Sequence, residues 1–169
     1  EMSRGLGDVY KRQRQLNYSE GHIPKGIRSN AYGNYSERRR FVYRIGVLTD
    51  KKKNGETYAK MISDYCITQK LFPLLETYQN QEVFFKEIQS NVPDIVLLVL
   101  PGVDGLNAAE HLHSLFPECG IIWCSDLDFS LHAFRLRVEY FFMEPVNELK
   151  IQEGLKAWFR SCLLYTSDA

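Results

Sequence analysis

The stretch that most limits how this chain can fold is an apolar run at residues 95–100, which follows Pro93 and Asp94 and leads into Pro-Gly-Val-Asp-Gly at 101–105. Six consecutive apolar residues are typical of a strand covered on both faces, as in a parallel sheet with helices above and below it. In open parallel sheets, sites form beyond the carboxyl ends of the strands. We therefore look for chemistry in a loop predicted at 101–105, although the strand itself ends in aliphatic side chains.

The composition suits one globular domain with a sizeable core. The 169 residues are 44% hydrophobic, and 21 basic residues balance 21 acidic ones, so no global charge attracts nucleic acid or anionic lipid. No apolar run approaches the roughly 18 residues of a membrane-spanning helix. We expect no membrane partner and a cytoplasmic location. The four cysteines form no Cys-x-x-Cys pair and are expected to be free thiols in a reducing compartment.

Both ends of the chain look unlike parts of a fold. Residues 1–13 and 162–169 resemble translated sequencing-adapter text, which would leave the natural chain cut at both ends. Residues 14–40 are polar and aperiodic and end in three arginines, and a run of this kind is usually solvated. We expect a disordered leader over 1–40 and a folded domain over 41–161.

Strand-like and helix-like patterns alternate through the folded part. Short β-type runs occur at 42–48, 74–78, 94–100, 121–124 and 140–143. Helical patterns occur at 58–66, 80–88, 109–116, 130–136 and 147–159, with Asn80 and Asn147 as expected N-caps, and a polar loop is expected at 49–55. Five such units predict an α/β fold, a doubly wound five-stranded parallel sheet in a three-layer sandwich.

Several of these segments resemble the receiver domains of bacterial response regulators, most closely those of the LytTR-type branch, in which a receiver precedes a DNA-binding domain. The segments are Pro-Asp-Ile-Val-Leu-Leu at 93–98 with Pro-Gly-Val-Asp-Gly at 101–105, Ile-Ile-Trp-Cys-Ser-Asp at 121–126, His-Ala-Phe at 132–134 and Tyr-Phe-Phe-Met-Glu-Pro at 140–145. The resemblance implies a flavodoxin-like fold over about 42–159 and a role in two-component signal transduction.

Receivers transfer a phosphoryl group onto their own aspartate with five groups, and the resemblance shows which positions of this chain should hold them. The two acids after the first strand, which bind Mg²⁺, fall on Thr49 and Asp50. The acceptor aspartate falls on Val99 if the strand is aligned from its start, or on Leu97 if it is aligned back from the following proline. The hydroxyl group falls on Ser125, and the lysine that should precede a proline is Glu144.

Three of the five groups are therefore missing, and we predict a pseudo-receiver that is not an enzyme and is not phosphorylated in the usual way. No cofactor is expected, and Mg²⁺ binding is disfavoured because Asp50 is the only remaining metal-ligand candidate. We instead expect Asp50 to cap the first helix. The lysines at 51–53 are interpreted as solvated rather than as an anion site. Ser125 fits either a hydrogen bond into the vestigial pocket or a plain turn, and a cis peptide is expected before Pro145.

The resemblance also implies partners. A homodimer would use the face of the fourth helix, fifth strand and fifth helix around Phe134, Tyr140 and Leu149, where Tyr140 matches the family's switch aromatic but is better interpreted as a packed or interface residue. DNA would be contacted only through a missing C-terminal domain, and a sensor kinase is a possible partner. Two alternatives stay open: a stand-alone interaction domain, and a small flavodoxin-like flavin- or nucleotide-binding protein. The second lacks a Gly-rich phosphate loop after the first strand.

Overall fold

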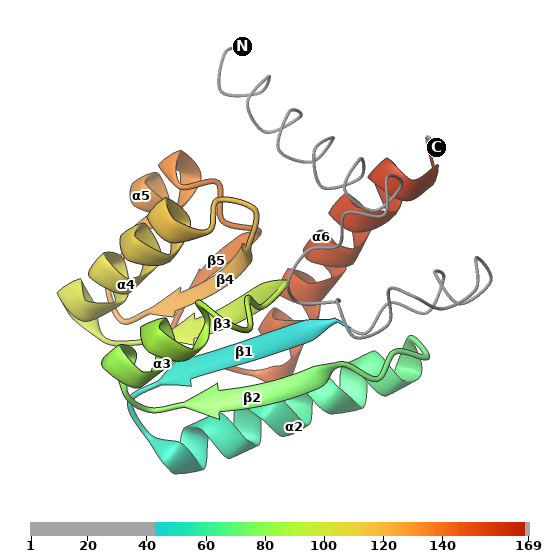
Figure 1. Cartoon of the computed structure of the whole chain (residues 1–169), viewed down its shortest axis with the longest axis horizontal. Coiled ribbons are helices and arrows are strands. Elements are labelled where there is room, and N and C mark those ends of the chain that lie inside the picture. Colours follow the sequence, from blue (N-terminus) through green and yellow to red (C-terminus); the bar gives the residue numbers. More distant parts are fainter. Residues whose placement is uncertain (1–42, 168–169) are drawn as a thin grey trace.

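The computed structural model describes residues 43–167 (Figure 1). The leader expected at 1–40 and the adapter-like residues 1–13 lie outside this range, and the adapter-like residues 162–169 lie partly outside it. The chain forms β1 (Arg44–Thr49), α2 (Lys52–Thr68), β2 (Leu74–Tyr78), α3 (Gln81–Glu87), β3 (Ile95–Val99), α4 (Gly102–Leu115), β4 (Gly120–Ser125), α5 (Ser130–Arg135), β5 (Tyr140–Met143) and α6 (Glu148–Ser167).

The five strands form one sheet in the order β2-β1-β3-β4-β5, and every neighbouring pair is parallel. The carboxyl ends of all five strands therefore lie at the same edge of the sheet (Figure 1). This arrangement confirms the predicted doubly wound α/β fold. Because β3 lies at the centre, its side chains are covered on both faces, which explains why residues 95–100 are all apolar.

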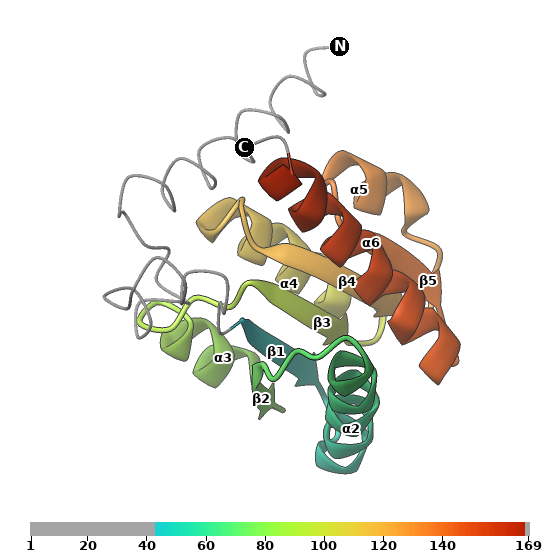
Figure 2. The same ribbon diagram turned by 90° about the vertical axis from the view of Figure 1, so that its right-hand side faces the viewer.

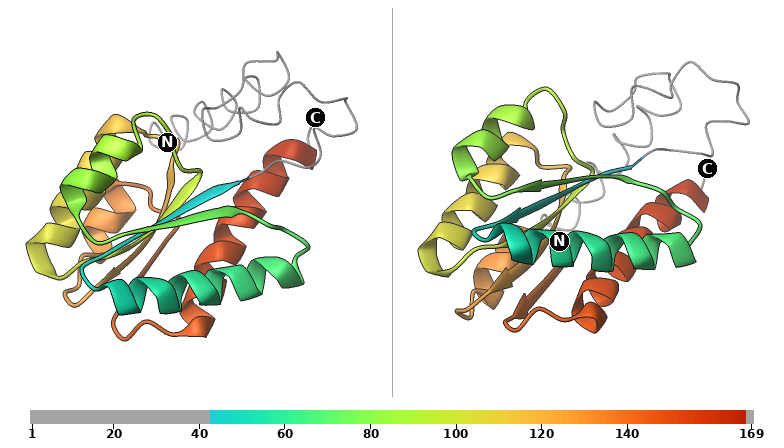
Figure 3. Two further views of the ribbon diagram at one scale, coloured as in Figure 1. Left: turned by 60° about the horizontal axis from the view of Figure 1, so that its bottom comes forward. Right: turned by 90° about the horizontal axis from the view of Figure 1, so that it is seen from below.

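Helices cover both faces of the sheet, with α2 and α6 on one side and α3, α4 and α5 on the other (Figures 2 and 3). On the first face, apolar residues of α2 and α6 such as Ile62, Leu155 and Trp158 pack against every second strand residue, including Leu97 and Val99. On the second face, residues of α3, α4 and α5 pack against the intervening strand residues: Phe84, Ala109, Leu112 and Ala133 meet Val96, Leu98 and Trp123. The alternation along each strand thus supplies two separate cores.

The helix ends show where local sequence signals succeed and fail. The side chain of Asn80 accepts a hydrogen bond from the Val83 N–H, and that of Asn147 accepts one from the Lys150 N–H, so both predicted N-caps are confirmed. The predicted loops at 49–55 and 101–105 are wrong in extent, because α2 already begins at Lys52 and α4 at Gly102. The polar and glycine-rich residues after β1 and β3 are thus mostly the first turns of helices rather than loops.

Gly105 shows why the segment after β3 is rich in glycine. A Cβ atom at Gly105 would lie 2.7 Å from the Leu100 carbonyl oxygen and 3.3 Å from Trp123 Nε1. The first turn of α4 therefore approaches β3 and β4 more closely than a side chain would permit.

The last helix continues past residue 161, the predicted end of the domain, to Ser167. No disulfide joins the four cysteines, all of which lie in the described part of the chain, and Cys66, Cys119 and Cys124 are buried. Among the helices of residues 43–167, none is long and apolar enough to cross a membrane.

Candidate functional site

The carboxyl edge of the sheet is built on a row of three residues. Thr49 at the end of β1 lies opposite Val99 at the end of β3, and Val99 lies opposite Cys124 on β4. Thr49 and Cys124 are fully buried, and the side chain of Val99 is 5% exposed. The centre of the edge is thus the isopropyl group of Val99, between a threonine and a thiol, and this central side chain has no nucleophilic atom.

The two positions proposed for the lost acceptor have different surroundings. Leu97 lies opposite Val47 on one side and Ile122 on the other, in the interior of the sheet, and is 1% exposed. Val99 is the last residue of β3. Both side chains face the core formed with α2 and α6, since they are two residues apart. Of the two positions, only Val99 lies at the edge where the strand meets the crevice.

Asp50 is exposed immediately after β1, and its carboxylate accepts a long hydrogen bond of 3.5 Å from the Thr49 hydroxyl. The expectation that Asp50 caps the first helix is wrong: the N-cap of α2 is Lys51, which makes no side-chain capping bond. Asp50 lies one residue before the N-cap position, because Lys52 and Lys53 form the first turn of α2.

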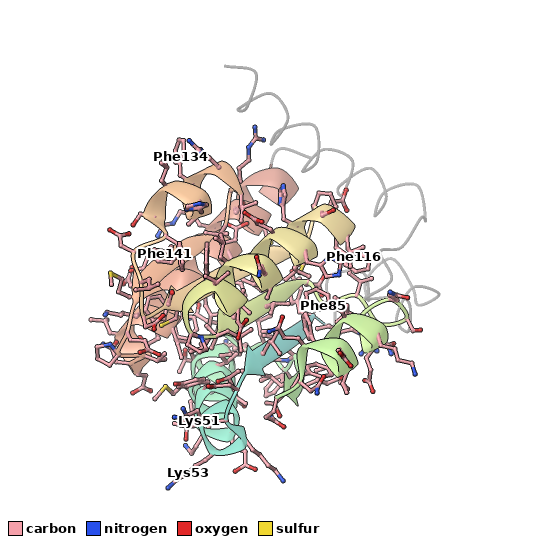
Figure 4. All side chains as sticks on the ribbon, turned by 90° about the vertical axis from the view of Figure 1, so that its left-hand side faces the viewer. Lys51, Lys53, Phe85, Phe116, Phe134 and Phe141 are labelled. Carbon is pink, nitrogen blue, oxygen red and sulfur yellow. The ribbon has the colours of Figure 1, made fainter. Side chains whose placement is uncertain are left out.

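The lysines at 51–53 are all exposed at the start of α2. Figure 4 shows Lys53 extending away from the body of the protein. Because these lysines are at the N-terminus of α2, their positive charges lie near the positive end of the helix dipole, and the first turn carries no acidic residue to offset them. That placement is consistent with solvated side chains.

Ser125 ends β4 and is buried, and it takes part in a turn network. Its hydroxyl oxygen accepts a hydrogen bond of 3.1 Å from the Leu127 N–H, and the hydroxyl lies 3.4 Å from Asp126 Oδ1 as a donor. Asp126 Oδ1 also accepts a hydrogen bond of 2.7 Å from the Gly102 N–H, at the start of α4. The Ser125 hydroxyl is thus used within the β4–α5 turn, and the neighbouring carboxylate reaches across to α4.

Glu144 follows β5, and its backbone N–H donates to the Ser125 carbonyl oxygen at 2.9 Å. The peptide bond between Glu144 and Pro145 is cis, as predicted. A cation does lie near this corner, but it comes from α6: Lys150 Nζ donates to the Met143 carbonyl oxygen at 3.1 Å and lies 5.5 Å from the centre of the Phe142 ring. The position before the proline therefore carries a negative charge, and the nearby ammonium group is bonded to the backbone.

The electrostatics connect several of these groups around Tyr58 on α2. Burial raises the pKa of the Tyr58 phenol, and the nearby carboxylates of Glu144 and Asp50 raise it further. Burial, with a smaller contribution from Glu144, also raises the pKa of the Cys124 thiol to about 12. Because the thiolate is the nucleophilic form, a thiol with this pKa is unreactive at neutral pH. Within residues 43–167, no group of three or more His, Cys, Asp or Glu side chains could hold a metal ion.

Solved structures share this architecture. The signal receiver domain of a DNA-binding response regulator from Colwellia psychrerythraea 34H matches with a TM-score of 0.59 and 16% identity, over 70% of this chain and 98% of its own. The REC domain of AraT, a response regulator from Geobacillus stearothermophilus, matches with a TM-score of 0.57 and 17% identity, over 76% of this chain and 100% of its own. The fold is that of response-regulator receiver domains.

A third match is the response regulator DrrB, an OmpR/PhoB homolog from Thermotoga maritima, with a TM-score of 0.55 and 21% identity, over 71% of this chain and 54% of its own. No protein-family model matches the sequence, and no curated protein matches it either. The receiver fold is therefore shared although the sequences differ widely.

The residues expected at an interface come from three elements at the β5 edge of the receiver fold, namely α5, β5 and α6 (Figure 2). Phe134 on α5 is 80% exposed, and Figure 4 shows it projecting from the outer surface of that helix. Leu149 on α6 is 65% exposed. Tyr140 is partly buried, packs against the core beneath α2 and α6, and has its ring centre 5.9 Å from that of Phe142.

Three residues at the carboxyl edge have no sequence signal of their own. Tyr58 fits the apolar stripe of α2, and Lys150 is one of many charged residues on a helix. Asp126 is one of two aspartates in a polar turn, and the carboxylate of the other, Asp128, accepts hydrogen bonds from Ser130 in the same turn. Their roles depend on contacts with distant segments of the chain, which local patterns do not reveal.

Proposed function

We propose that this chain is a pseudo-receiver, a signalling module with the receiver fold that acts through protein contacts and is not phosphorylated on an aspartate. The observation that carries the proposal is Val99 at the end of β3, buried between Thr49 and Cys124. Phosphoryl transfer to a receiver requires a carboxylate oxygen to attack phosphorus. An isopropyl group at this position has no lone pair with which to do so.

The surrounding charges support the same conclusion. Glu144 stands where a cation would be needed to stabilise a phosphoryl group, and the ammonium of Lys150 is bonded to the Met143 carbonyl. Thr49 replaces one of the two acids that would bind Mg²⁺, which leaves Asp50 alone. The proposal therefore includes no bound Mg²⁺, no other cofactor and no enzymatic activity.

The experiment is incubation of the purified chain with acetyl phosphate and Mg²⁺, followed by intact-mass measurement. We expect no mass increase for the natural sequence. A matched pair of variants calibrates the assay: Thr49→Asp with Val99→Asp and Glu144→Lys restores three groups, and the same set with Val99→Asn has the same shape without the nucleophile. An acid-labile increase of one phosphoryl group on the natural sequence would overturn the proposal.

We further propose that the module belongs to a LytTR-like transcriptional regulator located in the cytoplasm, with a DNA-binding domain that follows this segment in the full gene and a sensor kinase as a possible partner. The segment resemblances at 93–105 and 121–145 support this placement. Sequencing of the uninterrupted gene tests it. About 100 further residues with basic, β-rich patterning would support the regulator, and a stop codon soon after the domain would favour a stand-alone interaction domain.

The proposed contact surface is the α5–β5–α6 face, used by two copies of the chain. Its support is the exposure of Phe134 and Leu149, two large apolar side chains from different helices at the same edge of the sheet. Leu131 on α5 and Met143 on β5 are exposed as well, and a contiguous patch of exposed apolar side chains commonly marks an interface. Signalling through this face would need no phosphoryl transfer at the carboxyl edge of the sheet.

A further inference from the structure

Asp126 connects two turns that are distant in sequence. Its Oδ1 atom accepts a hydrogen bond of 2.7 Å from the backbone N–H of Gly102, 24 residues away, at the start of α4. The same oxygen lies 3.4 Å from the Ser125 hydroxyl, which in turn accepts the Leu127 N–H at 3.1 Å. One carboxylate thus joins the β3–α4 turn to the β4–α5 turn.

The donor that Asp126 bonds is suited to an anion. Gly102 is the first residue of the 14-residue helix α4, and the N-cap residue Pro101 supplies no side-chain capping bond. N–H groups at the start of a helix lack intrahelical acceptors and carry the positive end of the helix dipole. The carboxylate of Asp126 therefore occupies a position where a bound anion would otherwise be stabilised.

The backbone of Gly102 is shaped for this contact. Its φ angle is +53°, a conformation that residues with side chains rarely adopt, whereas no heavy atom lies within 4 Å of the position where a Cβ would be. Conformation rather than crowding therefore accounts for glycine here. The turn that presents the N–H to Asp126 depends on a residue that tolerates a positive φ.

We propose that Asp126 is a built-in anion that holds the β3–α4 and β4–α5 turns together at the carboxyl edge, without phosphorylation. This inference rests on the proposed pseudo-receiver function, because a phosphorylatable receiver would have its own phosphoryl group at this edge. The tethered β4–α5 turn leads directly into α5. Its Phe129 ring stacks on Trp123 with centres 5.5 Å apart, and the exposed Leu131 and Phe134 follow. The tether thereby limits movement of the turn that leads into the exposed side chains of α5.

Asp128 provides a matched control two residues away. Its carboxylate accepts hydrogen bonds from the N–H and the hydroxyl group of Ser130, so it bonds within the same turn and not across to α4. Asp126 and Asp128 are both exposed carboxylates with backbone N–H donors. Removing either carboxylate should therefore break hydrogen bonds of similar strength, but only the removal of Asp126 should affect the start of α4.

The test is amide hydrogen exchange of the whole chain, followed residue by residue by NMR. In Asp126→Ala we expect exchange at both Gly102 and Leu127 to rise by about fivefold or more, the ratio for loss of one hydrogen bond of ordinary strength. Asp126→Asn keeps an acceptor oxygen and should restore most of the protection at Gly102. Asp128→Ala should raise exchange at Ser130 and leave Gly102 unchanged.

Unchanged exchange at Gly102 in Asp126→Ala would overturn the tether. A uniform rise that includes the amides of β3 would also overturn it, since Asp126 would then contribute only to global stability. These results are independent of the acetyl phosphate experiment, which tests the pseudo-receiver. Phosphorylation of the natural sequence together with a local rise at Gly102 and Leu127 would show that the tether exists in a receiver that is still active.

Discussion

The two ends of β3 differ in whether they bury a polar side chain. At the amino end, Asp94 is 3% exposed, its carboxylate accepts a hydrogen bond of 2.8 Å from the Arg44 N–H, and its own N–H donates to the Arg44 carbonyl at 2.8 Å. At the carboxyl end, Val99 is equally enclosed and carries no polar group. The buried carboxylate thus lies at the end where it hydrogen-bonds the backbone of β1.

The difference shows which parts of a receiver are structural. A buried carboxylate is stable only when donors or cations compensate its lost hydration. The backbone of β1 provides that compensation for Asp94. At Val99 the neighbours are Thr49 and Cys124, which provide no positive charge. The fold can therefore form without an acid at position 99, since none of its strand pairing depends on one.

The largest expected loss of stability comes from placing an acid at the centre of β3 rather than at its end. Leu97→Asp places a charge in the middle of the sheet and removes a core side chain, so we expect a loss of about 4 kcal/mol or more in the free energy of unfolding, or failure to fold. Val99→Asp should cost about half as much, because the carboxylate can reach the edge. Urea denaturation measures both. Equal losses would show that the two positions are equally enclosed.

At the amino end, Asp94→Ala should lower the free energy of unfolding by about 2 kcal/mol, since it leaves a part-buried Arg44 N–H without its side-chain acceptor. The matched control is Asp64→Ala, which removes an exposed i,i+4 pair with Lys60 and should cost less than about 0.5 kcal/mol. Chemical denaturation compares the two variants. If they cost the same, Asp94 is not a structural carboxylate and the contrast between the ends of β3 is lost.

A smaller effect should appear at high pH at the carboxyl end. Burial raises the folded-state pKa of Cys124 from about 9 to about 12, whereas the unfolded thiol ionises near its ordinary pKa. Above about pH 9 the unfolded state therefore loses a proton that the folded state keeps, and stability falls as pH rises. Below pH 8 this group contributes no pH dependence.

The comparison that isolates this effect is the natural sequence against Cys124→Ala, with unfolding measured between pH 8 and pH 10.5. The variant should show a shallower decline, by up to about 1.4 kcal/mol per pH unit. Cys66→Ala should behave similarly, because burial raises the pKa of Cys66 to about 11. Parallel profiles for all three proteins would mean that the carboxyl end is open to solvent.

The smallest effect on stability is expected at the surface. Phe134→Ser removes an 80% exposed ring, so the free energy of unfolding should change by less than about 0.5 kcal/mol. If the α5–β5–α6 face forms a homodimer, the same change should weaken it, as measured by sedimentation equilibrium. Val83→Ser serves as the control, because Val83 is an exposed residue of α3, which covers the same face of the sheet beside β2, the edge strand opposite β5. A dimer unaffected by Phe134→Ser would rule out this face.

Much of the fold could be predicted from local patterns. The bounds of β2 and β5 match the predicted runs at 74–78 and 140–143, and Asn80 and Asn147 cap the helices they were expected to cap. Short apolar runs between turn residues and side-chain caps are local features, so one sequence suffices. The starts of α2 and α4 were placed too late because lysine-rich and glycine-rich segments look like loops when their tertiary contacts are unknown.

By itself, the sequence determined that a parallel sheet would form and that neither Leu97 nor Val99 could accept a phosphoryl group. Only the tertiary structure decided which of the two lies at the edge, because a strand covered on both faces is apolar throughout and its pattern does not mark where it ends. Pairing with Thr49 and Cys124 settles that position. The contact between Asp126 and Gly102 likewise exists only once β3 and β4 lie side by side.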